Sequence, residues 1–198
     1  MASNPRQSEL RVMIVDGDGE RSRNLRGALT LAGYHVVAEL KESLALPDAV
    51  NGLKPHIVIV AADSPDRDTL EHISVTTRDA PRPVVMFTQD GTSESIRAAV
   101  KAGVSAYVVD GLAPERIRSI LEVACARFDA HQELTGRLAE SERQLAERKN
   151  VERAKGLLMQ KRGLSEDEAF REMRDLAMRT GKKLGEVAET LIAAAHLL

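Results

Sequence analysis

The chain has 198 residues, of which 43% are hydrophobic, so it can bury a core in one or two domains and is not a disordered protein. Its 28 basic and 30 acidic residues give a net charge of −2, so any affinity for nucleic acid must come from a local basic cluster. A single cysteine excludes disulfides and cysteine-based metal sites, and neither a membrane-spanning run nor a signal-peptide pattern is present, which predicts a soluble cytoplasmic protein without a cofactor.

Five short apolar runs alternate with amphipathic stretches over roughly the first 110 residues. The runs are "VMIV" ending at Val15, "HVVAEL" from His35, "HIVIV" from His56, "PVVMF" from Pro83 and "AYVV" from Ala106. Strands that are almost continuously apolar and separated by helices predict an α/β fold with a five-stranded, doubly wound parallel sheet. Ligand or partner sites are then expected at the C-terminal ends of the strands.

One long helix is predicted from Pro114 to about Arg162, because this stretch contains few helix-breaking residues. A narrow apolar seam of Leu134, Leu138 and Leu145 runs through charged flanks, which is typical of a coiled coil and favours a homodimer. A solvated linker helix stays open as the alternative, since His131 and Gly136 weaken the heptad pattern.

The C-terminal part predicts two further helices after Gly163. Ser165 and Glu168 have the spacing of a capping box, and the helix that follows is expected to place Phe170 in the core. The last helix carries an apolar side with Leu184, Val187, Leu191 and Ile192. With the end of the long helix, these segments form a three-helix bundle.

Residues 8–128 resemble the receiver domain of two-component response regulators. In that family an acidic pair, a phosphorylated Asp, a hydroxyl residue and a Lys surround a divalent cation and a phosphoryl group. The resemblance places these roles, in chain order, at Asp16 with Gly17, Ala61, Thr88 and Asp110.

Two of these positions oppose phosphotransfer, because Ala61 has no oxygen to phosphorylate and Asp110 is negative where the family has a positive charge. Asp18 and Asp63 are candidate substitutes, but the Ser64-Pro65 turn is expected to lift Asp63 into a loop. The sequence therefore predicts a pseudo-receiver without phosphotransfer chemistry. An active phosphotransfer protein is the rival interpretation, which Ala61 opposes.

Residues 138–198 resemble the ANTAR domain of the AmiR/NasR antiterminators, through "AKGLLM", Gly163 and "SEDEAF" in order. With residues 114–148 as a coiled-coil linker, the whole architecture is similar to one-piece antiterminators, particularly the nitrate-responsive NasT type. The resemblance implies a transcription antiterminator that is not an enzyme and binds paired stem-loops in leader RNA. It also implies control by a partner similar to a nitrate-binding periplasmic protein.

The helix that carries "ERAKGLLMQKR" has one face suited to the bundle and another that is basic. The resemblance places RNA contacts at Ala154, Lys155 and Gly156, and helical spacing adds Arg148, Met159 and Arg162, with Lys161 a weaker candidate. Lys155 is expected to point away from the bundle core, and a change at Glu166 on the next helix is expected to have little effect. A merely solvated charged face is the alternative interpretation.

A DNA-binding response regulator of a phosphorelay is the rival function, since three short helices can form a helix-turn-helix. Against it, the last helix, "EVAETLIAAAHLL", lacks the Arg, Lys, Asn and Gln that read base edges. Residues 150–198 contain nine basic and eight acidic residues, a charge of +1, so RNA affinity is expected to depend on geometry and on pairing two modules.

Overall fold

The structure, a computed structural model, describes residues 10–109 and 114–195. Its internal contacts divide the chain into two units, one that ends at Gln132 and one that starts at Glu133, and each is described separately below. Within the described ranges, no helix combines the length and apolar character that crossing a membrane would need.

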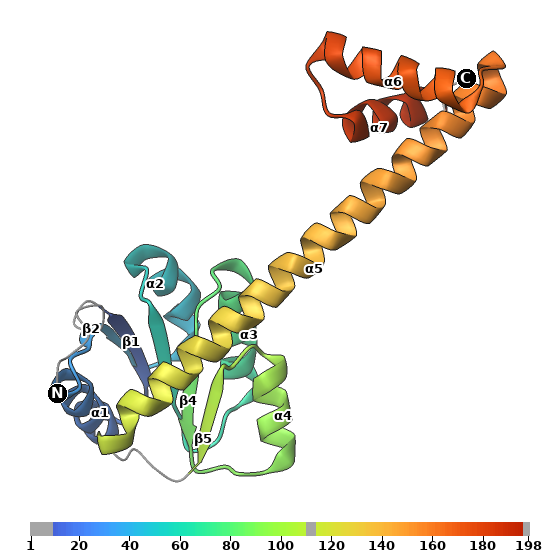
Figure 1. Cartoon of the computed structure of the whole chain (residues 1–198). Helices are drawn as coiled ribbons and strands as arrows, with labels where there is room; N and C mark the ends of the chain where they lie inside the picture. Colours follow the sequence, from blue (N-terminus) through green and yellow to red (C-terminus); the bar gives the residue numbers. More distant parts are fainter. Residues whose placement is uncertain (1–9, 110–113, 196–198) are drawn as a thin grey trace. The chain divides into compact units, whose positions relative to one another are not determined.

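The first unit is built on a parallel five-stranded sheet, as predicted (Figure 1). Its strands are β1 (Arg11–Asp16), β2 (His35–Leu40), β3 (Ile57–Ala61), β4 (Val84–Thr88) and β5 (Ala106–Val109). Their order in the sheet is β2-β1-β3-β4-β5, with every neighbouring pair parallel. The sheet order reverses between β1 and β3, and a pocket is expected beside the C-terminal ends of these two strands.

Helices cover both faces of this sheet. They are α1 (Gly19–Leu31), α2 (Leu46–Leu53), which follows the short 3-10 helix η1 (Ser43–Ala45), α3 (Arg67–Asp79), α4 (Ser93–Lys101) and the start of α5 (Pro114–Arg162). One core packs α1 and α5 against the sheet through side chains such as Leu25 and Ile117, and the other packs α2, α3 and α4 through side chains such as Val50 and Ile73. The doubly wound fold predicted from the alternating runs is confirmed.

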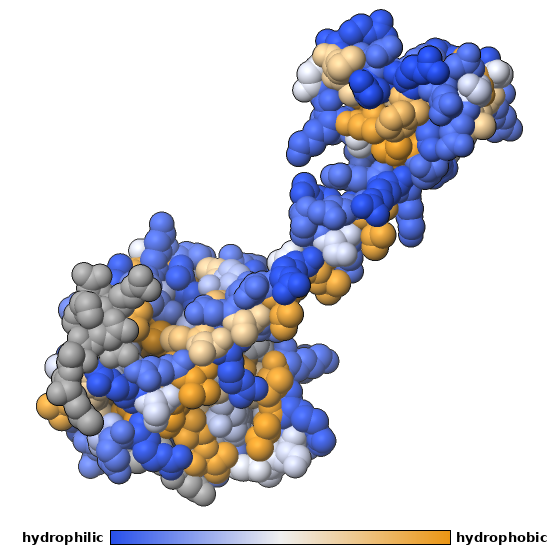
Figure 2. Space-filling view, in the orientation of Figure 1, coloured by the Kyte–Doolittle hydropathy of each residue, from blue (hydrophilic) through white to orange (hydrophobic). Residues whose placement is uncertain are grey.

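The helix α5 is continuous from Pro114 to Arg162, as the sequence predicts. Ile117, Leu121 and Ala124 are buried in the first unit. Beyond Gln132 the seam residues Leu134, Leu138 and Leu145 are 63%, 60% and 54% exposed. Figure 2 shows scattered hydrophobic residues along an otherwise hydrophilic stretch of this helix. The seam is therefore available to a partner, while the homodimer itself stays a prediction.

The second unit packs the end of α5 with α6 (Glu166–Thr180) and α7 (Leu184–Ala195). The capping box predicted at Ser165 and Glu168 is present. The fully buried side chains of its core include Ala154, Ala169, Met173 and Ala188. Phe170 is 40% exposed, so the prediction that it belongs to the core is wrong: the buried stripe of α6 runs one residue to the side, through Ala169, Met173 and Ala177.

Candidate functional site

A hollow of about 450 Å³ lies at the C-terminal ends of β1 and β3, where a receiver domain would carry its phosphorylation site. Its lining contains five acidic and two basic residues, which are Asp16, Asp18, Glu42, Asp63, Asp66, Arg21 and Lys41. Ala61 ends β3 at this hollow and is almost completely buried. The sheet thus builds the receiver pocket, and the side chains decide what it can hold.

The guanidinium of Arg21 occupies the centre of this acidic group. Its Nε lies 3.1 Å from both carboxylate oxygens of Asp16, and its Nη2 lies 2.8 Å from Oδ1 of the same residue. Nη1 donates to Asp63 at 2.5 Å, and Nη2 to the Ala61 carbonyl oxygen at 3.4 Å. These bonds, first of all those to Asp16, raise the pKa of Arg21 above its ordinary value. A tethered cation therefore lies where acidic oxygens converge.

The other acidic candidates of the pocket, Asp18 and Asp63, are engaged in different ways. Asp18 is the N-cap of α1, and its side chain accepts from the backbone of Glu20 at 2.8 Å, the largest cause of a lowered pKa. Asp63 lies in the loop after β3 with its side chain 76% exposed, and it reaches the pocket through Arg21. Asp18 and Asp63 thus already have partners.

The hydroxyl of Thr88 also connects loops. It donates to the carbonyl oxygen of Asp63 at 2.9 Å and accepts from the backbone N–H of Asp90 at 3.1 Å. The carboxylate of Asp90 accepts bonds from Ser95, Thr92 and Ser64, which lower its pKa to about 2. The loops after β3 and β4 are thereby joined, and Thr88 itself is not among the residues that line the hollow.

These residues do not fit the divalent cation and phosphoryl group that a receiver pocket binds. Gly17 supplies no second carboxylate, although an added Cβ there would meet only ordinary contact, 3.5 Å from the carbonyl oxygen of Lys41. Ala61 supplies no acceptor, and Arg21 already binds the one buried carboxylate, Asp16. Asp110, predicted at the lysine position, lies outside the described residues.

Sequence reasoning missed Arg21, although the sequence carried a signal for it. Arg21 is the third residue of α1, and a basic side chain in a helix's first turn is opposed by the helix dipole unless acidic groups compensate it. Asp16 lies five residues before it at the end of a buried strand, which was sufficient reason to expect the pair.

The second candidate site is the surface of α5 around Lys155, and here one prediction is wrong. Lys155 does not point away from the bundle: the residue is only 9% exposed. Its Nζ contacts Glu152 Oε1 at 2.9 Å and Glu166 Oε1 at 2.7 Å. The bond to Glu166 is the main cause of a raised pKa for Lys155. Glu166 is therefore a direct partner of Lys155, and the expectation that a change at Glu166 has little effect no longer holds.

The remaining basic candidates differ in how they are engaged. Arg162 pairs with Glu172, and Lys161 donates to the carbonyl oxygen of Ala195 at 3.3 Å. Arg148 is exposed, and within the ranges that the structure describes it makes no ion pair. Met159, 39% exposed, adds an apolar side chain one turn after Lys155.

The two small residues that flank Lys155 have opposite environments. Ala154 is completely buried, so its methyl group packs inside the bundle and does not reach the surface. Gly156 is exposed, and a Cβ added there would meet nothing within 4 Å. Packing of the bundle therefore does not require a glycine at position 156. A glycine in a helix interior also lowers helix stability by about 1 kcal/mol relative to alanine, so packing and helix stability do not explain its presence.

Comparison with known proteins gives this second unit a family. Residues 139–192 match the ANTAR domain. Over 182 residues the chain is 30% identical to the transcriptional regulatory protein PdtaR of Mycobacterium tuberculosis H37Rv, an alignment that covers 92% of this chain and 89% of that protein. The chain belongs to the ANTAR-domain transcriptional regulators. In this ANTAR regulator, Lys155, Gly156 and Met159 lie within the matched domain.

The other comparisons concern parts of this ANTAR regulator. It is similar to the signal receiver domain of a modulated diguanylate cyclase from Desulfovibrio desulfuricans G20, with a TM-score of 0.56 and 18% identity over 62% of this chain and 98% of that one, which shows the receiver fold alone. It is 37% identical to the nitrate regulatory protein of Klebsiella oxytoca over 73 residues, 36% of this chain and 18% of that protein. This match is too short to support the resemblance to the NasT type.

Proposed function

We propose that this ANTAR regulator is an RNA-binding transcription antiterminator that binds paired stem-loops in a leader transcript. The observation that carries the proposal is the ANTAR match over residues 139–192, which includes exposed Gly156 beside Lys155. A helix without a side chain at that point allows the close approach that a splayed loop base requires. Arg148, Lys155, Met159, Lys161 and Arg162 supply contacts around it, with Ala154 beneath as the packing residue.

We further propose that RNA binding does not depend on phosphorylation, and that a partner protein provides control. Support for the first point comes from Ala61 and from the bonds of Arg21 to Asp16 and Asp63. A role in nitrate assimilation, with a sensor similar to a nitrate-binding periplasmic protein, belongs to the same proposal and rests on the resemblance to the NasT type.

The RNA assignment is tested by substitution at Gly156. Gly156→Leu is expected to leave folding intact, since open space surrounds the position, and to lower affinity for a leader RNA with two stem-loops by about tenfold or more. Gly136→Leu is the matched control, because that glycine also lies in α5 with nothing within 4 Å of an added Cβ.

Both changes should raise helix stability by similar amounts, which circular dichroism can compare. Fluorescence anisotropy would measure binding to the RNA and to duplex DNA of the same sequence. Parental RNA affinity in Gly156→Leu, or preference for the duplex, would contradict the proposal.

Phosphorylation independence is tested with acetyl phosphate and Mg²⁺. The intact mass and the RNA affinity are both expected to stay unchanged, because no carboxylate lies at position 61. Ala61→Asp alone is not expected to restore turnover, since Gly17 and Asp110 remain and Arg21 still binds Asp16. A stoichiometric acyl phosphate on the parental chain would refute the pseudo-receiver proposal.

The coiled-coil homodimer is tested by replacing Leu138 and Leu145 together with Gln. Self-association is expected to weaken, because both side chains belong to the exposed seam. Sedimentation equilibrium measures the effect, and Leu31→Gln with Leu44→Gln provides a control with two exposed leucines outside α5. An unchanged dimer would place the interface elsewhere, and a monomeric parental protein would remove the proposal.

A further inference from the structure

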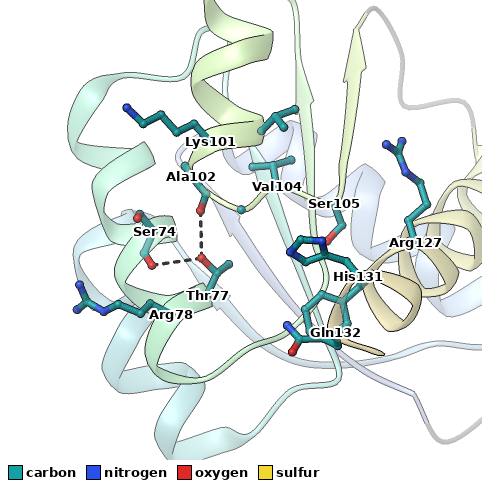
Figure 3. A pocket seen from close by; sticks show the side chains of 13 residues that line it. Ser74, Thr77, Arg78, Lys101, Ala102, Val104, Ser105, Arg127, His131 and Gln132 are labelled. Atoms are coloured by element: carbon teal, nitrogen blue, oxygen red, sulfur yellow. Dashed lines mark hydrogen bonds between the residues drawn. The ribbon is translucent and has the colours of Figure 1, made fainter. Parts of the chain in front are cut away.

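A second pocket lies within the first unit, away from the acidic hollow and Arg21. It has a volume of about 450 Å³ and lies between the C-terminal half of α3, the α4–β5 connection and the part of α5 around Phe128. In Figure 3 the imidazole of His131 and the hydroxyl of Ser105 lie near the middle, Arg78 and Lys101 at one side, and Arg127 at the other. The size is in the range of small-molecule sites.

The charged residues that line this pocket are all basic. Arg78, Lys101 and Arg127 line it together with His131, and no Asp or Glu is among its lining residues. Arg78 pairs with the neighbouring Asp79 at 2.8 Å. Lys101 and Arg127 are exposed and form no ion pair within residues 10–109 and 114–195. In a chain with net charge −2, a pocket whose charged lining residues are all basic favours an anion over a cation.

The wall of the pocket is preformed by its own hydrogen bonds. The single hydroxyl proton of Thr77 is shared between the carbonyl oxygens of Ala102, 3.0 Å from Oγ1, and Ser74, 3.2 Å from Oγ1, as Figure 3 shows. Gly103 has φ +98°, and a Cβ there would lie 2.6 Å from Thr77 Oγ1. The α4–β5 connection is thereby fixed against α3, and a ligand needs to order only the long cationic side chains at the rim.

We propose that this pocket binds a small multivalent anion that carries phosphate or carboxylate groups. Lys101 and Arg127 lie on opposite sides of the pocket, with their charged ends extending outward in Figure 3. By a change of rotamer each exposed side chain can form a charge-assisted hydrogen bond to such a ligand, with Ser105 and Gln132 as polar neighbours. A ligand held between them would connect α5 to the α4–β5 connection of the same unit. This inference goes beyond RNA binding, because it gives the receiver-like unit a chemical input other than phosphorylation.

The test is calorimetric titration of the full chain with pyrophosphate and with citrate, compared with sodium chloride of equal ionic strength. Saturable binding of either anion is expected, and the two arms distinguish a phosphate ligand from a carboxylate ligand. Lys101→Gln with Arg127→Gln should raise the dissociation constant about tenfold or more, from the loss of two charge-assisted bonds.

The matched control is Arg23→Gln with Arg116→Gln, which removes the same charge from exposed positions that do not line the pocket. Its dissociation constant should equal that of the parental protein. No saturable binding of either anion, an equal response to sodium chloride, or equal losses in the two double variants would each overturn the proposal. Because no RNA is present, failure here leaves the antiterminator proposal unaffected, and failure of the RNA experiments leaves this pocket unaffected.

Discussion

Arg21→Met is expected to destabilise the first unit by about 3 kcal/mol or more. The side chain of Asp16 is completely buried, and Arg21 provides three of its contacts within 3.1 Å. Without the guanidinium, Asp16 retains the N–H of Asp18 at 2.9 Å but loses its counter-charge. A buried carboxylate without a paired cation is among the costliest defects a core can contain.

Chemical denaturation of the full chain measures this effect, and two further variants isolate its cause. Asp16→Asn in the Arg21→Met background should recover most of the lost free energy of unfolding, since it removes the unpaired charge. Arg23→Met, two residues further along α1 and exposed, should change stability by less than about 0.5 kcal/mol. If Arg21→Met were as mild as Arg23→Met, the guanidinium would not be what holds the pocket together.

Lys155→Met and Glu166→Gln are expected to change RNA affinity in opposite directions. Methionine keeps the buried aliphatic length of Lys155 but removes its charge, so affinity should fall by about tenfold or more. The slope of log affinity against log salt should also decrease by about 0.7–0.9 per lost phosphate contact. Glu166→Gln removes the carboxylate that accepts from Lys155 at 2.7 Å, so RNA phosphate meets less competition and affinity should rise.

Asp167→Asn is the control for Glu166→Gln, because it changes the charge equally at the next residue of α6. Asp167 is exposed and forms no ion pair in the part of the chain that the structure describes. Filter binding over a series of salt concentrations would measure all three variants. Equal gains in RNA affinity for Glu166→Gln and Asp167→Asn would mean that the effect comes from general repulsion between acidic side chains and RNA phosphates. Parental RNA affinity in Lys155→Met would exclude Lys155 from the interface.

The elements that the sequence predicts correctly are those whose signal is local. The strand that ends at Ala61 is a run of buried β-branched residues between turns, and the capping box of Ser165 and Glu168 is a contact between residues three apart. The long helix from Pro114 to Arg162 follows from the scarcity of breakers. Each of these features is decided within a few neighbouring residues, so periodicity and capping chemistry suffice.

The predictions that failed concern residues at the edge of a helix face. At 100° per residue, Lys155 lies about 40° from Val151 and about 60° from Leu158, so it borders the buried stripe of α5 and is covered by its neighbours. Phe170 lies about 60° from Met173, the centre of the α6 stripe, and falls on the exposed side. Residue spacing alone locates the buried face of a helix only approximately. Packing against other helices decides what the residues at the border of that face contact.

Besides Arg21 with Asp16, sequence reasoning missed two pairs that join different elements of the fold. Arg21 meets Asp63 across 42 residues, and Lys155 meets Glu166 across the turn between two helices. A charged side chain has several possible partners at such separations, and only the fold selects one. The sequence therefore indicates only that the pocket has lost carboxylates of the receiver family. The structure adds that the guanidinium of Arg21 lies among the acidic side chains that remain.

The tethered guanidinium of Arg21 makes the charge of the pocket independent of its surroundings. A diffusible metal ion can leave a pocket whenever its concentration falls, but a cation that belongs to the polypeptide is present at a constant effective concentration in every cell state. Restoring a phosphorylation site would require changes at Gly17, Arg21, Ala61 and Asp110 together, and loss of Arg21 alone would leave the carboxylate of Asp16 buried without a counter-charge. The positive charge at the centre of this pocket is therefore part of the chain itself and does not depend on the concentration of metal ions around it.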